Sequence, residues 1–113
     1  MHSGCQIEIS VEDVRLQVAR GESVALIDVR EPAEYALARL DGATLIPMAT
    51  VPQRLPFLEG LSDEKMLIVF CHHGVRSLHV VNWLRGQGIE NAQSMQGGID
   101  AWSRLIDPSV PRY

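Results

Sequence analysis

The sequence predicts an α/β domain, in which short buried strands alternate with helices along the chain. Continuous apolar runs at Val24–Ile27 and Met66–Phe70 are typical of strands that are covered on both faces. The segments between such runs have helical spacing, with glycine or proline near their ends. Because no repeat, low-complexity tract or linker divides the pattern, we expect one domain over residues 1–113.

The first half of the chain is expected to hold three strands and two helices. We predict the strands at residues 6–9, 24–27 and 43–46. Ser10, with Asp13 three residues later, resembles a capping box and begins a helix that continues to Arg20, before Gly21. Pro32 suits the first turn of the second helix, which is expected over residues 33–38.

The second half of the chain predicts two more strands, at residues 66–70 and 92–95. Three prolines interrupt the helical pattern of residues 47–60, so only a broken helix is expected there. A helix is predicted over residues 77–87, and another follows the pair Gly97–Gly98. Trp83 and Trp102 fall within the apolar patterns of these helices, and we expect both to be core aromatics.

Composition excludes several classes of protein. The 113 residues are 46% hydrophobic and 21% charged, as in a globular domain, and no apolar stretch approaches the roughly 20 residues that span a bilayer. No signal peptide is recognised, so a cytoplasmic location without a membrane partner is expected. The formal charge of −4 and the absence of a Lys/Arg run argue against nucleic acid as a partner.

Cys71 is the candidate nucleophile. It stands at the end of the apolar run Met66–Phe70 and begins a short polar loop that leads into a predicted helix at Ser77. The amides of such a loop, the helix N-terminus and neighbouring cations lower a thiol pKa and stabilise a thiolate or a persulfide. His72, His73 and Arg76 add donors for an anion, and the guanidinium can hold an oxyanion in a forked contact.

Other interpretations of these residues remain open at this point. Cys71 could be a small buried hydrophobe at a strand end, and the histidines could belong to a loop that faces water. A metal site made of Cys71, His72, His73 and His79 is not expected, because no CxxC or HxxxH spacing is present. Cys5 could act as a resolving thiol, but near a terminus a bystander role is the better interpretation.

Four segments in order resemble the rhodanese-type sulfurtransferases. Leu26–Tyr35 is similar to the first signature of this family, and Gly42–Ala43 and Ile46–Pro47 follow it at the family's spacing. The active-site loop resembles Cys71–Ser77, and the closing signature resembles Gly97–Trp102. The chain departs from many members of the family at Ala38–Leu40, where those members have Gly-His-Ile.

The resemblance implies a three-layer rhodanese-like domain with a central, mostly parallel five-stranded sheet flanked by helices. It implies that Cys71 takes a sulfane sulfur and carries it as a persulfide, without a cofactor or metal. Asp28 and Arg30 match positions with a structural role, as an ion pair near a strand end. The remaining loop positions would cradle the sulfur and select the donor, and they are His72, His73, Gly74, Val75, Arg76 and Ser77.

Under this resemblance the donor would be thiosulfate or a protein persulfide, and the acceptor a thiol, cyanide or a protein. The ending Ile106–Tyr113 resembles the tail of rhodanese domains fused to enzymes that activate sulfur-carrier proteins, which favours such a carrier as acceptor. One alternative is a non-catalytic module that binds a partner or senses oxidants. Another is a phosphatase or arsenate reductase, although those loops usually place five residues between cysteine and arginine, whereas Cys71 and Arg76 enclose four.

Overall fold

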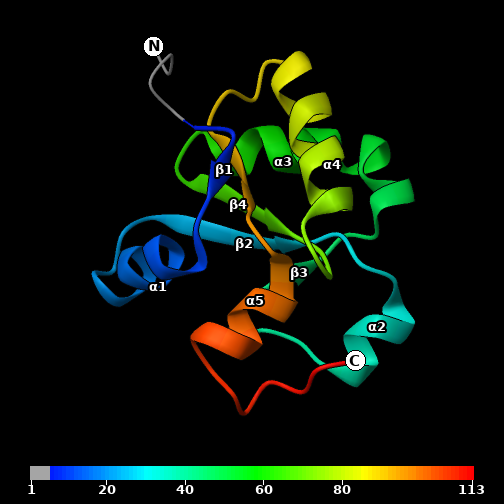
Figure 1. The fold of residues 1–113 in the computed structure, drawn as a ribbon. Helices are drawn as coiled ribbons and strands as arrows, with labels where there is room; N and C mark the ends of the chain where they lie inside the picture. Colours follow the sequence, from blue (N-terminus) through cyan, green and yellow to red (C-terminus); the bar gives the residue numbers. More distant parts are fainter. Residues whose placement is uncertain (1–5) are drawn as a thin grey trace.

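Five parallel strands form one sheet in the computed structural model, which describes residues 6–113 (Figure 1). The spatial order is β1-β5-β4-β2-β3, and every neighbouring pair is parallel. The predicted α/β class with a five-stranded parallel sheet is therefore confirmed. The strands are β1 (Glu8–Ile9), β2 (Val24–Asp28), β3 (Thr44–Leu45), β4 (Met66–Phe70) and β5 (Ala92–Met95).

Helices cover both faces of the sheet and complete three layers (Figure 1). Helices α3 and α4 pack on one face, whereas α1 and α5 pack on the other. Two short 3₁₀ turns, at Met48–Thr50 and Pro52–Arg54, precede α3. The helices are α1 (Val11–Ala19), α2 (Pro32–Leu37), α3 (Leu55–Ser62), α4 (Val75–Gly86) and α5 (Gly98–Leu105).

The central strand β4 supplies both halves of the core. Its side chains alternate in direction, so Leu67 and Val69 join the cluster under α3 and α4, whereas Ile68 and Phe70 join the cluster under α1 and α5. All four side chains are fully buried. Cys71 continues the alternation and lies on the α3–α4 side, so the core of that layer reaches up to the thiol.

Backbone geometry at Gly74 explains why α4 begins two residues before the predicted start at Ser77. Gly74 is the N-cap of α4 and has a φ angle of 103°, a left-handed conformation that favours glycine. Residues 47–60 do form a broken helix, since two 3₁₀ turns precede α3 and Pro52 and Pro56 occupy first-turn positions.

The expectation that both tryptophans are core aromatics is wrong for Trp83, which is 37% exposed. Helix α4 turns Val80, Val81 and Leu84 toward the sheet, and the helical period leaves Trp83 at the margin of that apolar face. Trp102 is half-buried and packs against the cluster under α1 and α5.

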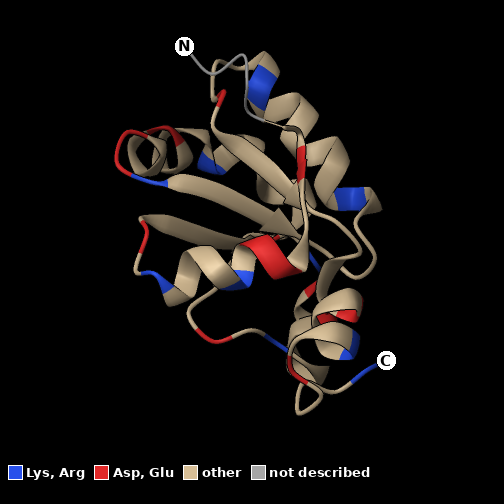
Figure 2. Cartoon of the chain, turned by 60° about the vertical axis from the view of Figure 1, so that its left-hand side comes forward, with Lys and Arg blue, Asp and Glu red and all other residues tan. Residues whose placement is uncertain are grey.

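Charge is mixed along the surface elements, and basic and acidic residues are interspersed in the view of Figure 2. Within residues 6–113, none of the helices combines the length and the apolar character that a membrane crossing requires.

Candidate active site

Cys71 follows β4 at the carboxyl end of the sheet, where the loop of residues 71–74 leads into α4 (Figure 1). The end of the β5–α5 loop at Gly97 and the first residue of α5, Gly98, lie beside it. Ligands of open parallel sheets bind at this edge, because the loops that follow the strands converge there.

The sulfur of Cys71 accepts two backbone hydrogen bonds. The amide nitrogen of Gly74 lies 3.1 Å from the sulfur, and that of Ser77 lies 3.3 Å from it. The hydroxyl of Ser77 is 3.4 Å from the same sulfur and 2.8 Å from the hydroxyl of Ser94. Two backbone N–H groups and one hydroxyl therefore converge on this sulfur.

The thiol is also buried, since Cys71 is 1% exposed and packs in the cluster under α3 and α4. The interpretation of Cys71 as a buried residue that contributes to the core therefore applies, and two backbone amides also point at its sulfur.

Gly98 allows the neighbouring loop to approach closely. A Cβ at this position would overlap the carbonyl oxygens of Cys71 and His72, and its φ angle of 61° is left-handed. The same carbonyls accept hydrogen bonds from the first amides of α5: Ile99 N lies 2.9 Å from the Cys71 oxygen and Asp100 N lies 3.1 Å from the His72 oxygen. The start of α5 thus fixes the backbone that carries the thiol.

Arg76 pairs with Glu34 of α2 through its two terminal guanidinium nitrogens. Nη1 lies 2.6 Å from Oε1 of Glu34, and Nη2 lies 2.9 Å from Oε2. The carboxylate raises the pKa of Arg76, and Arg76 lowers the pKa of Glu34 to about 2. The forked contact that the sequence assigns to an oxyanion is therefore made by a carboxylate of the chain itself. Nothing in the local spacing of the sequence indicates Glu34 as the partner of Arg76.

The two histidines of the loop lie in one stack of rings. The ring centroids of His72 and His73 are 3.9 Å apart, and the ring of Tyr113 stacks on the other side of His72 at the same separation and 9° from parallel. Burial lowers the pKa of His72, and the neighbouring His73 acts in the same direction, so both favour the neutral imidazole. The stack makes Tyr113 part of the site, which the sequence did not predict.

The remaining predicted loop residues differ in their access to the sulfur. Gly74 and Ser77 are buried against it, whereas the side chain of Val75 is 66% exposed and lies at the start of α4. Val75 therefore belongs to the outer surface of the loop.

Asp28 and Arg30 form a fully buried ion pair at the end of β2. Arg30 Nη2 lies 2.7 Å from Oδ2 of Asp28, and Nε lies 2.9 Å from Oδ1. Arg30 Nη2 also donates to the Ala38 carbonyl, and Nη1 donates to the hydroxyl of Tyr113 at 2.9 Å. The pair joins the end of β2 to the segment after α2, and it is the ion pair that the sequence suggested near a strand end.

A metal ion is poorly served by the residues around the loop. Ligand atoms of His72, His73 and Asp100 lie within 4.8 Å of one another. However, the two carboxylate oxygens of Asp100 accept hydrogen bonds from Arg104 and Arg112, whose charges oppose a bound cation. Cys5, the other cysteine, lies outside the described residues.

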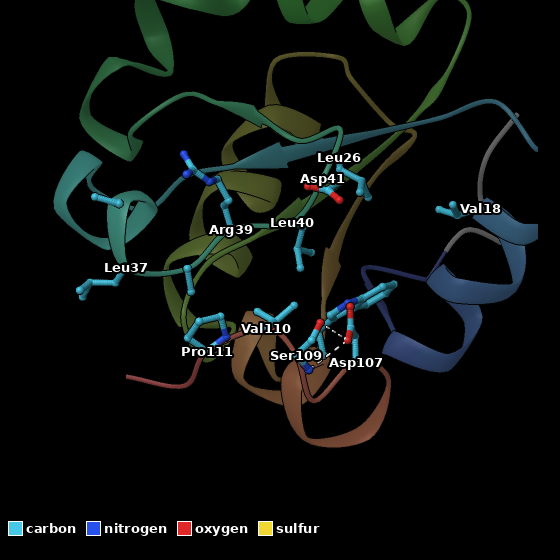
Figure 3. Close-up of a pocket in the computed structure, with 13 residues that line it drawn as sticks. Val18, Leu26, Leu37, Arg39, Leu40, Asp41, Asp107, Ser109, Val110 and Pro111 are labelled. Carbon is cyan, nitrogen blue, oxygen red and sulfur yellow. Dashed lines mark hydrogen bonds between the residues drawn. The ribbon is translucent and has the colours of Figure 1, made fainter.

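A surface hollow of about 470 Å³ lies away from the thiol (Figure 3). It is lined by the segment after α2, which includes Arg39 and Leu40, and by the tail residues Val110 and Pro111. Neither Cys71 nor the other residues of its loop line this hollow.

The model of the rhodanese-like domain matches residues 10–105 of the chain. The chain belongs to the rhodanese-like domain family. Its sequence is 40% identical over 93 residues to the rhodanese-like/PpiC domain-containing protein 12 of Arabidopsis thaliana, covering 81% of this chain and 31% of that protein. It is 32% identical over 105 residues to the probable adenylyltransferase/sulfurtransferase MoeZ of Mycobacterium tuberculosis, covering 93% of this chain and 26% of MoeZ. The chain thus spans less than a third of the length of these curated relatives.

Rhodanese-like proteins of similar size also match. A sulfurtransferase of Allochromatium vinosum is 32% identical, over 91% of this chain and 94% of that protein. Among solved structures, the human single-domain sulfurtransferase TSTD1 is 27% identical with a TM-score of 0.75, covering 88% of this chain and 97% of that one. A rhodanese-related protein of Thermoplasma volcanium is 27% identical with a TM-score of 0.80, covering 96% and 100% of the two chains. The predicted rhodanese-like fold is confirmed.

Proposed function

We propose that this protein is a sulfurtransferase that carries a sulfane sulfur as a persulfide on Cys71. The observation that carries the proposal is the pair of backbone amides, of Gly74 and Ser77, that point at the Cys71 sulfur. Relatives named sulfurtransferases, of similar size or as parts of longer proteins, support this class of reaction.

The proposed reaction has two half-reactions. First, the Cys71 thiolate attacks the sulfane sulfur of the donor, so that a new S–S bond forms on Cys71. The donor's own bond to that sulfur breaks, and its electron pair leaves with sulfite from thiosulfate or with the thiolate of a persulfide donor. Second, a thiolate or cyanide attacks the outer sulfur, and the electron pair of the broken bond returns to Cys71. Because both steps exchange bonds at sulfur, no cofactor or metal is required.

Loop residues receive specific roles in this proposal. The amides of Gly74 and Ser77 and the Ser77 hydroxyl stabilise negative charge on the Cys71 sulfur and then on its persulfide. His72, His73 and Arg76 form the wall that a donor passes, with Val75 at its outer edge. Arg30 donates to the hydroxyl of Tyr113, whose ring stacks on His72, so the Asp28–Arg30 pair supports this wall through Tyr113.

A protein partner is the proposed acceptor. The tail at Ile106–Tyr113 resembles that of rhodanese domains fused to enzymes that activate sulfur carriers, and relatives such as MoeZ and the MOCS3 proteins of Zea mays are named adenylyltransferase and sulfurtransferase. We infer that the sulfur is relayed from a small sulfane donor or a persulfide-bearing protein to a sulfur-carrier protein. The cytoplasmic location remains a prediction.

Transfer kinetics test the relay. The chain and its Cys71→Ser variant are supplied with thiosulfate, or with a cysteine desulfurase and cysteine, and sulfur transfer to a thiol acceptor is followed. We expect ping-pong kinetics, faster transfer from the desulfurase than from thiosulfate, and no transfer by the folded variant. Faster transfer from thiosulfate would contradict the relay, and transfer by Cys71→Ser would refute the role of Cys71.

A further inference from the structure

Tyr113 touches the site at three points, although it lies far along the chain from all of them. Its ring stacks on His72, its hydroxyl donates to Oε2 of Glu34 at 2.8 Å, and its oxygen accepts from Nη1 of Arg30 at 2.9 Å. In Figure 1 the C-terminal end of the chain lies beside α2, the helix that carries Glu34. Neither the fold nor the proposed reaction by itself explains why this side chain is held here.

The path of the tail places Tyr113 firmly. Val110 is buried, and its carbonyl accepts a hydrogen bond from the Ser103 hydroxyl at 2.6 Å. Arg112 donates to Asp100 at 3.1 Å. Two hydrogen bonds therefore hold the tail on α5 before it reaches the site. The contacts of Tyr113 thus belong to an ordered C-terminal segment beside the Cys71 loop.

The Tyr113 hydroxyl holds the carboxylate that pairs with Arg76. Oε2 of Glu34 accepts from Tyr113 and from Nη2 of Arg76, while Oε1 accepts from Nη1 of Arg76. Burial raises the pKa of Tyr113, so its hydroxyl keeps a proton to donate. Arg30, which donates to the same hydroxyl, fixes the oxygen from the other side.

As a result of these contacts, the positive charges of the side chains around the thiol are balanced by negative ones. The guanidinium of Arg76 is matched by Glu34 and that of Arg30 by Asp28, and burial lowers the pKa of His72, which favours its neutral form. Arg76 is close enough to Cys71 for the two to interact electrostatically, so the neutralisation by Glu34 is felt where a donor would bind. A donor with two negative charges gains little from such a wall.

We propose that Tyr113 is a specificity-determining positioning residue, which holds Glu34 on Arg76 and thereby disfavours sulfur donors that carry two negative charges. This inference rests on the proposed sulfur transfer and assigns its donor class: persulfides and other donors of low charge. Loss of the hydroxyl should loosen Glu34 and leave more of the Arg76 charge for a dianion.

Two small donors isolate the effect of charge. Thiosulfate carries two negative charges and methanethiosulfonate carries one, and each gives its terminal sulfur to a thiolate while releasing sulfite or methanesulfinate. The ratio of kcat/KM for thiosulfate to that for methanethiosulfonate, with cyanide as acceptor, therefore reports discrimination by charge. It is measured for the unmodified chain and for Tyr113→Phe, Glu34→Gln and Tyr35→Phe.

Tyr113→Phe keeps the ring on His72 and removes only the hydroxyl, so we expect the ratio to rise roughly threefold to tenfold, as one lost hydrogen bond implies. Most of the change should lie in KM for thiosulfate. Glu34→Gln should raise the ratio further, because an amide cannot balance the guanidinium. Tyr35 is the matched control, because it lies on the same helix as Glu34 and its ring contacts Arg39 and not Arg76. Tyr35→Phe should leave the ratio unchanged.

An unchanged ratio in Tyr113→Phe would overturn the inference, as would an equal loss of activity with both donors, because a purely structural role predicts that result. A second readout needs no sulfur transfer. The rate of Cys71 alkylation by iodoacetate, divided by that by iodoacetamide, should rise in Tyr113→Phe, since the two reagents differ in charge.

These two readouts also separate the inference from the proposed function. If the unmodified chain takes sulfur from neither small donor nor from a desulfurase-bound persulfide, the proposed function fails, and the alkylation ratio still decides the role of Tyr113. An alkylation ratio that is the same in both proteins would contradict that role.

Discussion

The hydroxyl of Ser77 lies 3.4 Å from the sulfur of Cys71, in a fully buried contact. The thiol donates to this hydroxyl, and Ser94 lies 2.8 Å away on its other side. When Cys71 loses its proton, the Ser77 hydroxyl can turn to donate to the sulfur, because Ser94 can then donate to the Ser77 oxygen. Ser77 is thus the side chain that responds most directly to the charge on Cys71.

Ser77→Ala should slow the loading of Cys71 with sulfur by about tenfold, since one hydrogen bond to a charged group is worth about 1.5 kcal/mol or more. The amide of Ser77 remains, so loading should not be abolished. Single-turnover loading from a sulfane donor measures the effect. Ser62→Ala, which removes a hydroxyl that donates to the Glu59 carbonyl within α3, is the control, and equal loading rates in the two variants would contradict the role of Ser77.

Arg30→Met should destabilise the fold by about 3–5 kcal/mol, because it leaves the carboxylate of Asp28 buried without its partner. Urea denaturation measures this loss. Arg20→Met is the comparison, since Arg20 pairs with Glu22 on the surface and is 67% exposed, and its substitution should change stability by no more than about 0.5 kcal/mol. Similar losses of unfolding free energy in Arg30→Met and Arg20→Met would contradict the prediction that the buried Asp28–Arg30 pair matters more than a surface pair.

Gly98→Ala should displace the Cys71 loop and abolish sulfur loading, because the new Cβ would overlap the carbonyls of Cys71 and His72. The loading assay and the thermal midpoint together report the effect. Gly86→Ala, within α4 and with open space around its Cβ, should load normally and be neutral or slightly stabilising. Normal loading by Gly98→Ala would mean that the two loops need not pack this closely.

Acid should weaken the fold through Glu34. Its pKa is about 2 in the folded protein against an ordinary value of 4.5, chiefly because of Arg76, so the folded state favours the ionised form. The stabilisation is therefore complete above about pH 4.5 and is lost as the pH falls toward 2. Urea denaturation at pH 6 and pH 3 should show a smaller loss in Glu34→Gln than in the unmodified chain, and identical losses would contradict this role of Glu34.

Much of the fold follows from local patterns in the sequence. The strands at residues 66–70 and 92–95 have the predicted bounds, because mostly buried runs are flanked there by polar residues or the site cysteine. Cys71 and its loop could be singled out for the same reason, since a strand end followed by a helix start is a local signal.

The site's side-chain partners could not be predicted in this way. Glu34 lies 42 positions from Arg76, and Tyr113 lies 79 positions from Glu34, so their contacts arise only when α2, α4 and the tail assemble at one edge of the sheet. The start of α4 was missed because the left-handed backbone of Gly74 lets the helix begin early.

Mass spectrometry of Cys71 after incubation with a sulfane donor tests the central claim most directly. The peptide that contains Cys71 should gain one sulfur atom, lose it again on addition of a thiol acceptor, and gain nothing in a folded Cys71→Ser variant. If Cys71 stays unmodified with thiosulfate, methanethiosulfonate and a desulfurase-bound persulfide, while the thiol is intact, the account of this protein as a persulfide carrier is contradicted.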